Sequence, residues 1–369
     1  IDLSKAFETI NHQLLISKLR HYEFEDPSLS LMDNYLKERF CLVKQGDQKS
    51  EMEPLRTGVP QGSILGPLLF IIFFNDLNYL KISSKLFQYA DDTTVTYACD
   101  SIVDLVTVLT SDLTQIAAWL HHNHLLLNVA KTQAIDFAIS NRGTKREQPS
   151  DLEIDGKKIK YVDQITQLGV TFDRHVKFDQ HTINICRKVN IKLFTLLRCA
   201  HLFNRNFKTT LFKLFIQAHF DYCSTVYAHI TSISSTRLNR CFSRALFRLL
   251  KINIKNMDIS EQFQLLAPFE ILPLSLRLCF RFNTFLFGLC KWNEQSSILK
   301  YINTQRNEKN HLIHPICYTD LLKFSFSTIS IKHLNLYLSD NIFLSKSTFI
   351  FFLKREILDV YIKTLNFFT

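Results

Sequence analysis

The four residues Tyr89-Ala90-Asp91-Asp92 constrain this chain more than any other stretch, because they lie between two runs of strand-forming residues. Lys85 to Gln88 precedes them, and Thr93 to Tyr97 follows. Two strands joined by a tight turn place both aspartates at the tip of a hairpin. Adjacent carboxylates repel unless a cation lies beside them, so the pattern indicates a metal site. Asp is also common in turns for conformational reasons alone, so the pair needs support from elsewhere in the sequence.

That support comes from two earlier blocks. The sequence opens with Ile1-Asp2-Leu3-Ser4-Lys5-Ala6-Phe7, and residues 57–70 read Thr-Gly-Val-Pro-Gln-Gly-Ser-Ile-Leu-Gly-Pro-Leu-Leu-Phe. In order and spacing the three blocks resemble the palm motifs of reverse transcriptases, most of all those of non-LTR (LINE-type, jockey-like) retrotransposons. Residues 128–132 resemble the fourth palm motif, and residues 167–170 resemble the primer-grip hairpin. The resemblance runs from residue 1 to about residue 175.

The resemblance implies nucleotidyl transfer, an in-line displacement at phosphorus that two divalent cations assist. Hard Mg²⁺ prefers oxygen ligands, so Asp2, Asp91 and Asp92 are the expected ligands of two Mg²⁺ ions, with Mn²⁺ as an alternative. Asp2 and Asp91 are far apart in the sequence, so only a fold that joins two strand ends makes them one site. Asp92 can point away from Asp91, because alternate side chains of a strand face opposite sides.

Phe7 is the candidate for sugar selection. By resemblance, an aromatic ring at this place stacks under the sugar of the incoming nucleotide and leaves no room for a 2′-hydroxyl, so the product is DNA. The alternative is that Phe7 packs in a core, as Phe usually does.

The second block forms a compact turn that leads into the apolar stretch Ile64 to Phe74. Its glycines let the backbone approach a ligand, and its proline presets the turn or an early helical position. The resemblance places this block beside the nucleotide and template, together with Tyr89; the alternative is a plain turn before a buried helix. The residues concerned are Gly58, Pro60, Gln61, Gly62 and Ser63.

Three other residues take roles from the resemblance alone. Lys131 is expected to donate a proton to the departing pyrophosphate, although most lysines are solvated surface residues. Leu168 and Gly169 are expected to form the primer grip.

The predicted fold class is α+β, a right-hand polymerase palm of antiparallel sheet and packed helices followed by helical parts. We expect palm and partial fingers in residues 1–178, a helical thumb in 179–262, and a helical extension of unknown role in 263–369. Within the palm, the patterns predict helices at 9–21 and 102–128, alternating and turn-rich pieces at 29–57, a loop from Gly143 to Asp151, and short strands at 152–173 divided by the Asp155-Gly156 turn.

Three apolar stripes at helical spacing predict the thumb helices. They comprise Ile185, Val189, Leu193, Leu196 and Ala200; Phe207, Leu211, Leu214, Ala218 and Tyr222; and Leu238, Phe242, Ala245 and Leu249. Leu274 to Leu289 and Phe349 to Leu365 are further helical candidates.

Basic charge is concentrated in the predicted thumb. Residues 180–260 hold thirteen lysines and arginines against two aspartates, while the whole chain has a net charge of +10. Arg237, Arg240, Arg244 and Arg248 share one helical face. This face is expected to contact nucleic-acid phosphates; the alternative is a solvated charged face.

Nine cysteines without a Cys-x-x-Cys pair indicate reduced thiols in an intracellular protein. His311, His314 and Cys317, with Cys290 upstream, have a spacing unlike the zinc knuckle of the resembled proteins, so ordinary side chains are the favoured interpretation. His121, His122 and His124 are better read as a helix end near Trp119 than as a metal site.

The expected partners are an RNA template, a DNA primer and deoxynucleoside triphosphates, and the resemblance implies a nuclear location. No membrane association is expected, because the longest apolar run, Leu68 to Phe74, is too short to cross a bilayer. The sequence lacks an initiator Met and begins inside the first block, so we expect a fragment without its upstream fingers. Glu8 stands where the resembled proteins usually carry aspartate. The competing hypothesis is therefore an inactive remnant that at most binds nucleic acid. A viral RNA polymerase is disfavoured, because those proteins typically carry Gly-Asp-Asp.

Overall fold

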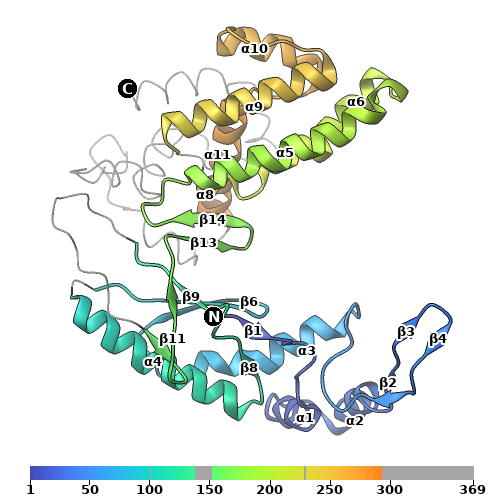
Figure 1. Ribbon diagram of the computed structural model, residues 1–369, viewed down its shortest axis with the longest axis vertical. Coiled ribbons are helices and arrows are strands. Elements are labelled where there is room, and N and C mark those ends of the chain that lie inside the picture. Colours follow the sequence, from blue (N-terminus) through green and yellow to red (C-terminus); the bar gives the residue numbers. More distant parts are fainter. Residues whose placement is uncertain (100, 138–151, 228–229, 293–369) are drawn as a thin grey trace. The chain divides into compact units, whose positions relative to one another are not determined.

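The computed structural model describes residues 1–99, 101–137, 152–227 and 230–292 (Figure 1). The chain divides into two compact units, residues 1–165 and residues 166–369. Helices and short strands mix in the chain, which confirms the α+β class. The predicted loop from Gly143 to Asp151, the zinc candidates His311, His314 and Cys317, and the helical candidate at 349–365 lie outside the described residues.

The strands of the first unit form small ladders. β1 (Leu3–Ser4) pairs antiparallel with β8 (Leu126–Leu127), and β6 (Lys85–Tyr89) pairs antiparallel with β7 (Asp92–Thr96). β10 (Glu153–Ile154) and β11 (Lys157–Lys158) form the hairpin expected at Asp155-Gly156. β9 (Gln133–Ala134) and β12 (Lys160–Tyr161) pair in parallel. Within the described ranges every sheet has two strands, and most of these pairs are antiparallel.

Two helices follow the first block. α1 (His12–His21) begins at Asn11, whose side chain accepts a hydrogen bond of 3.0 Å from the Leu14 amide and so caps the helix. α2 (Asp26–Leu36) lies where the sequence analysis expected only alternating and turn-rich pieces, which is a correction. Pro27 stands in the first turn of α2, where a missing amide proton is harmless. Leu29 and Leu36 are buried, and this burial stabilises the helix.

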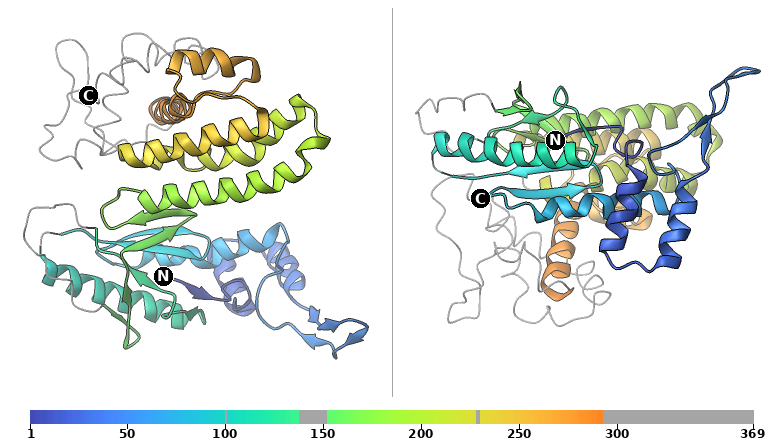
Figure 2. Two further views of the ribbon diagram at one scale, coloured as in Figure 1. Left: turned by 45° about the horizontal axis from the view of Figure 1, so that its top comes forward. Right: turned by 90° about the horizontal axis from the view of Figure 1, so that it is seen from below.

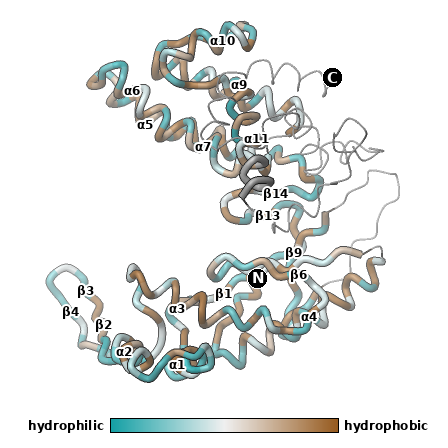
Figure 3. Tube along the Cα trace, turned by 180° about the vertical axis from the view of Figure 1, so that it is seen from behind, coloured by the Kyte–Doolittle hydropathy of each residue, from teal (hydrophilic) through white to brown (hydrophobic). Residues whose placement is uncertain are grey.

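The core of the first unit is built around α3 (Leu65–Phe74), which the 3-10 helix η1 (Asn75–Tyr79) extends. Phe70 and Phe73 are fully buried in it, with Leu15 and Leu19 of α1. Figure 3 shows α3 as one of the most hydrophobic segments of this unit. Burial of these side chains fixes the end of α3 that carries the second block.

α4 (Ile102–His122) is shorter than the predicted helix at 102–128, because His124 takes a left-handed backbone conformation with φ 57° and the chain then enters β8. α4 is long and apolar enough to span a membrane by length and composition alone. Its Leu113, Ile116, Ala117 and Leu120 are nevertheless buried in the cores of the first unit. We read α4 as an amphipathic helix of that unit.

A ribbon projects from the first unit in Figure 1. β2 (Phe40–Cys41) pairs with β5 (Glu53–Pro54), and β3 (Lys44–Gln45) pairs with β4 (Gln48–Lys49). All residues of these four strands except Phe40 and Pro54 are polar or small, and every one is exposed. This ribbon accounts for the alternating pattern of residues 40–55.

The second unit is mostly helical. It opens with the hairpin of β13 (Gln164–Gln167) and β14 (Val170–Asp173), and the division between units falls within β13. α5 (Asp179–Cys199) and α9 (Ser232–Leu250) run side by side in both views of Figure 2. The remaining segments are η2 (Ala200–Leu202), α6 (Arg205–Leu211), the π-helix η3 (Phe212–Gln217), α7 (Ala218–Asp221), α8 (Ser224–Tyr227), α10 (Ile259–Leu266), η4 (Ala267–Phe269) and α11 (Leu274–Trp292).

The first and third predicted stripes are confirmed, since Ile185, Val189 and Leu193 of α5 and all four apolar residues of the α9 stripe are buried. The second stripe is wrong in part. Phe207, Leu214 and Tyr222 are exposed, whereas Phe212, Ile216 and Phe220 are fully buried. The π-helix η3 explains the difference, because its wider turn rotates the buried face away from the spacing of a regular α-helix.

Candidate active site

The β6–β7 hairpin places the aspartate pair at its tip, as predicted. Tyr89 pairs with Asp92, so Ala90 and Asp91 form the two-residue turn. Ala90 has φ 52°, a left-handed conformation that disfavours any residue with a Cβ. Asp91 is half-buried, while Asp92 and Tyr89 are exposed. A strained turn in a two-strand hairpin is typical of functional sites, where surrounding structure holds an unfavourable backbone.

Asp2 lies against two other predicted segments. Its backbone carbonyl accepts a hydrogen bond of 2.9 Å from the Asn128 amide, and its amide donates to the Thr132 hydroxyl at 3.2 Å. These bonds join the first block to the segment that resembles the fourth palm motif. Lys131 lies in the same turn and is exposed.

The backbone nitrogen of Ile1 links the first block to the hairpin, since it donates a hydrogen bond of 2.8 Å to the carbonyl of Thr93 in β7. The carboxylates of Asp2 and Asp92 both lie near this nitrogen. Two carboxylates far apart in sequence are therefore neighbours of one backbone atom. The fold brings the start of the chain to the base of the hairpin.

One Asp2 atom fits a cation. Its Oδ2 is buried and has no hydrogen-bond partner. A buried acceptor without a donor is unfavourable, and a hard cation satisfies it. Across the described ranges no three His, Cys, Asp or Glu side chains converge closely enough to hold a metal by themselves. Any cation at Asp2 would therefore need oxygens from substrate or water in addition to aspartates.

Phe7 packs against the core. Its ring is half-buried and stacks on Phe70 of α3, with ring centroids 4.5 Å apart. This contact is the one expected for core packing, while Phe7 as a whole keeps part of its surface exposed. Both interpretations of Phe7 therefore stand on this geometry.

The second block is held tightly to the first block. Gly58 has φ 79°, and its amide donates to the Ile10 carbonyl at 2.8 Å. A Cβ at Gly58 would lie 2.8 Å from both Cα and the carbonyl oxygen of Glu8, so only glycine fits. The Val59 amide donates to the Phe7 carbonyl at 2.9 Å. The turn thus runs directly along the segment that carries Phe7.

The end of the second block leads into α3. The Ser63 hydroxyl donates to the Pro60 carbonyl at 2.7 Å and accepts from the Gly66 amide at 2.9 Å, which fixes the entry to the helix. Gln61 is exposed, and its side-chain amide donates to the Glu8 carboxylate at 3.3 Å. Gly62 has φ 77° with open space around it. Glu8, the departure from the resembled pattern, therefore contacts the glutamine expected at the template.

The second unit carries the remaining predicted residues. Leu168 and Gly169 form the turn between β13 and β14. Arg240, Arg244 and Arg248 are exposed along α9, as expected for a charged face. Arg237 differs from them, because its guanidinium donates to the hydroxyls of Thr182, at 2.9 Å, and Ser234, at 3.2 Å. Arg237 joins α9 to α5 and is a structural residue of that face.

Two residues at the second block were missed by the sequence analysis. His12 and Arg39 both hydrogen-bond to the carbonyl of Gly58. No periodicity or motif identifies them, because their shared acceptor is a backbone atom. His121, in contrast, was rightly assigned to a helix end, and its imidazole contacts the Asp155 carboxylate at 2.8 Å.

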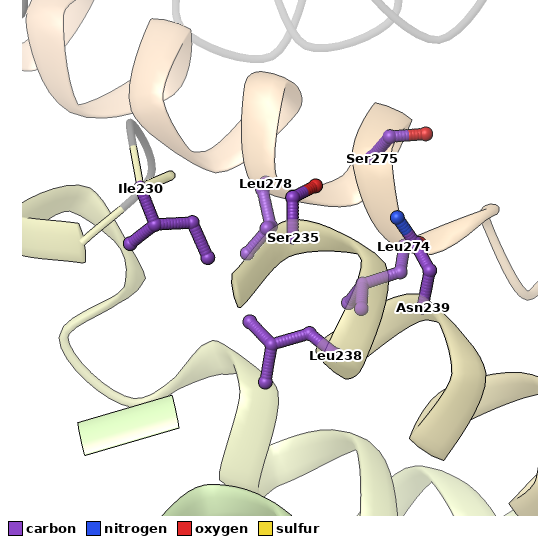
Figure 4. Close-up of a pocket in the computed structure, with 7 residues that line it drawn as sticks. All are labelled: Ile230, Ser235, Leu238, Asn239, Leu274, Ser275 and Leu278. Carbon is purple, nitrogen blue, oxygen red and sulfur yellow. The ribbon is translucent and has the colours of Figure 1, made fainter. Parts of the chain in front are cut away.

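A small pocket lies in the second unit between α9 and α11 (Figure 4). Its volume of about 50 Å³ is enough for a water molecule or two. Leu238, Leu274 and Leu278 supply an apolar lining, with polar atoms from Ser235, Asn239 and Ser275. The pocket is too small for a nucleotide.

Comparison with known proteins agrees with this geometry. Residues 1–172 match the family described as reverse transcriptase (RNA-dependent DNA polymerase). The probable RNA-directed DNA polymerase from transposon BS of Drosophila melanogaster is 31% identical over 188 residues, which are 49% of this chain and 20% of that protein. The RNA-directed DNA polymerase from mobile element jockey of the same organism is 26% identical over 200 residues, 52% of this chain and 21% of that protein.

A third relative is the probable RNA-directed DNA polymerase from transposon X-element, also of Drosophila melanogaster. It is 25% identical over 229 residues, 60% of this chain and 25% of that protein. This chain therefore spans 20 to 25% of the length of these relatives. The structure brings the first block, the turn at residues 128–132 and the β6–β7 hairpin together in the first unit. Residues 1–172, just under half of the chain, are therefore similar to reverse transcriptase domains, and the relatives that share this part are RNA-directed DNA polymerases of transposons.

Proposed function

We propose that this chain adds deoxynucleotides to the 3′ end of a DNA primer on an RNA template by two-metal phosphoryl transfer. The observation that carries the proposal is the meeting of the first block with the β6–β7 hairpin, through the bond from Ile1 to Thr93. It supports a shared site of Asp2 and Asp92, within the residues that match the reverse transcriptase family. The buried, unpartnered Oδ2 of Asp2 supports cation binding at that place.

Asp2, Asp91 and Asp92 would hold the Mg²⁺ ions, which when bound lower the pKa of the primer hydroxyl and neutralise the leaving pyrophosphate. The chain's own groups supply orientation. Gln61 and the turn that carries it would border the template and the nucleotide, with Tyr89 at the exposed hairpin tip. Lys131, which is exposed, would donate a proton to pyrophosphate.

The partners follow from the same proposal. Deoxynucleotides are favoured over ribonucleotides if the exposed part of Phe7 meets the sugar, and Phe7→Val then raises ribonucleotide use. An unchanged ratio of ribonucleotide to deoxynucleotide incorporation in a folded, active variant would show that Phe7 serves only core packing.

The basic face of α9 would contact duplex phosphates, and the Leu168-Gly169 turn would contact the primer. A nuclear location stays a prediction, which imaging of a tagged chain in cells tests; exclusion from the nucleus would contradict it.

Primer extension on an RNA template tests the function directly. We expect extension by the 369-residue chain that stops on chelation and returns with Mg²⁺ or Mn²⁺. Asp91→Asn should reduce the rate about 100-fold or more, because charge stabilisation by a bound metal contributes several kcal/mol. Asp47→Asn, on the exposed ribbon, is the matched control and should leave the rate unchanged.

Two outcomes contradict the proposal. Extension that survives Asp91→Asn at the original rate removes Asp91 from the mechanism. Duplex binding by the wild-type chain without any extension at several Mg²⁺ and Mn²⁺ concentrations supports an inactive nucleic-acid-binding protein instead.

A further inference from the structure

Two side chains from distant parts of the first unit converge on the backbone carbonyl of Gly58. His12 Nε2 lies 2.8 Å from this oxygen, and Arg39 Nη2 lies 2.6 Å from it. Gly58 is buried, and both His12 and Arg39 are half-buried. A buried carbonyl that receives two donors, one of them charged, is held much more firmly than an ordinary turn carbonyl.

The geometry also assigns the imidazole proton. A carbonyl oxygen only accepts, so His12 Nε2 carries the proton that it donates to Gly58. Arg39 Nη2 lies 3.4 Å from the same nitrogen. Since a protonated Nε2 cannot accept from Arg39, this short approach is the result of two donors aimed at one oxygen. Together they occupy both lone pairs of the Gly58 carbonyl.

Each donor is itself anchored to a helix end. His12 is the first residue of α1. The Arg39 Nε donates to the carbonyl of Leu36 at 3.1 Å, and Leu36 is the last residue of α2. A cation beside the last carbonyls of a helix is favourable, because these carbonyls carry the negative end of the helix dipole. The Gly58 carbonyl is thus fixed to two helices that bury Leu15, Leu19 and Leu36 in the core.

The turn so held carries residues of the proposed active site. On one side, the Gly58 and Val59 amides bind the carbonyls of Ile10 and Phe7. On the other side, the chain continues through Pro60 to the exposed Gln61. A shift of the Gly58 carbonyl would therefore move the glutamine and loosen the backbone that carries Phe7.

We propose that His12 and Arg39 are positioning residues that hold the Gly58 turn so that Gln61 meets the nucleotide and template. This inference rests on the proposed polymerase function. Both side chains act through the carbonyl of Gly58, which they hydrogen-bond. Loss of either side chain should raise KM for the nucleotide more than it lowers kcat.

Amide hydrogen exchange of the full chain tests the structural half without any catalysis. Arg39→Gln and His12→Phe should each speed exchange at residues 58 and 59 by about tenfold or more, because a charged or buried hydrogen bond to the turn is lost. Arg39→Lys should restore part of the protection. Arg20→Gln, an exposed arginine of α1, is the matched control and should leave exchange at 58 and 59 unchanged.

Primer-extension kinetics test the functional half. Arg39→Gln should raise KM for the deoxynucleotide about tenfold with a smaller change in kcat, and Arg39→Lys should recover part of the loss. Unchanged exchange at residues 58 and 59 in both variants overturns the inference, as does faster exchange with wild-type KM and kcat. If the wild-type chain extends no primer, the proposed polymerase function fails. Faster exchange in the variants would then show only that His12 and Arg39 hold the turn, and their proposed role in nucleotide positioning would be overturned.

Discussion

The Tyr222 hydroxyl donates a hydrogen bond of 2.6 Å to the backbone carbonyl of Leu168, which joins the residue after α7 to the β13–β14 turn. Leu168 has φ 46° and Gly169 has φ 78°. A leucine in the left-handed region is unfavourable by about 1–2 kcal/mol, so other contacts must hold this turn. The Tyr222 ring also lies 3.3 Å from the place of a Cβ on Gly169. Tyr222 therefore supports the turn that resembles a primer grip.

Tyr222→Phe should test this support with the loss of one oxygen atom. We expect a destabilisation of about 0.5–1.5 kcal/mol, near the low end because Tyr222 is exposed, and a raised KM for the primer in extension assays. Urea denaturation followed by circular dichroism measures the stability. Tyr79→Phe, at another exposed tyrosine, is the control. Equal behaviour of the two variants would show that the Tyr222 bond contributes nothing.

Gly58 and Gly62 offer a matched pair of substitutions, since their φ angles are 79° and 77°. Gly62→Ala meets open space, so it should destabilise by about 1–2 kcal/mol from backbone strain alone. Gly58→Ala should lose a further ~1–3 kcal/mol, because its Cβ would collide with backbone atoms of Glu8. Urea denaturation of both variants measures the difference. Equal losses of stability in the two variants would mean that the backbone at Glu8 shifts without cost to make room for a Cβ at residue 58.

His181 should make the second unit sensitive to acid. Burial lowers the pKa of its imidazole, and Lys188 lowers it further. In the unfolded chain His181 has an ordinary pKa of about 6.5 and takes up a proton below that pH. In the folded chain His181 stays neutral to a lower pH. The contribution of neutral His181 to the free energy of unfolding is therefore fully present above about pH 6.5, and it is lost as the pH falls below that value. His219, whose pKa is also lowered by burial, acts in the same direction.

Urea denaturation between pH 5.2 and 7.5 measures this effect. The wild-type free energy of unfolding should fall towards low pH, and His181→Gln should show a shallower fall. His201→Gln, at an exposed histidine of η2, should keep the wild-type slope. If His181→Gln also keeps that slope, the acid sensitivity belongs to other groups.

The arginines of α9 should separate into two kinds. Replacement of Arg240, Arg244 and Arg248 by Gln should reduce the slope of log affinity against log salt by about two units, because each lost phosphate contact removes ~0.7–0.9. Arg237→Gln should instead lower stability, because Arg237 bonds to Thr182 and Ser234. Filter binding of an RNA–DNA duplex across salt concentrations measures the slope.

A triple replacement of Lys44, Lys49 and Lys157 by Gln removes the same charge from exposed sites of the first unit and is the control. A salt slope that falls equally in both triple variants would mean that α9 has no special contact with the duplex.

Local patterns predicted several elements well. The β6–β7 hairpin, the Asp155-Gly156 turn and the buried stripes of α5 and α9 all follow from spacing and turn chemistry, which act over a few residues. α2 was missed because Asp26, Pro27, Ser28 and Asn34 also favour turns, and the burial of Leu29 and Leu36 decides for a helix only in the folded structure. The α6–η3–α7 face was misread because a π-helix changes the period, and no periodic pattern anticipates that change.

The sequence by itself determined which residues are available for chemistry: two aspartates at a hairpin tip, a third at the start of the chain, and a glycine-rich turn before an apolar helix. Only the tertiary structure decided how they meet. Asp2 lies close to the hairpin because the backbone nitrogen of Ile1 bonds to Thr93, and the Gly58 turn is fixed because His12 and Arg39 share its carbonyl. Those contacts join backbone atoms to groups far away in the chain. Every residue has the same backbone atoms, so no residue pattern in the sequence marks such contacts.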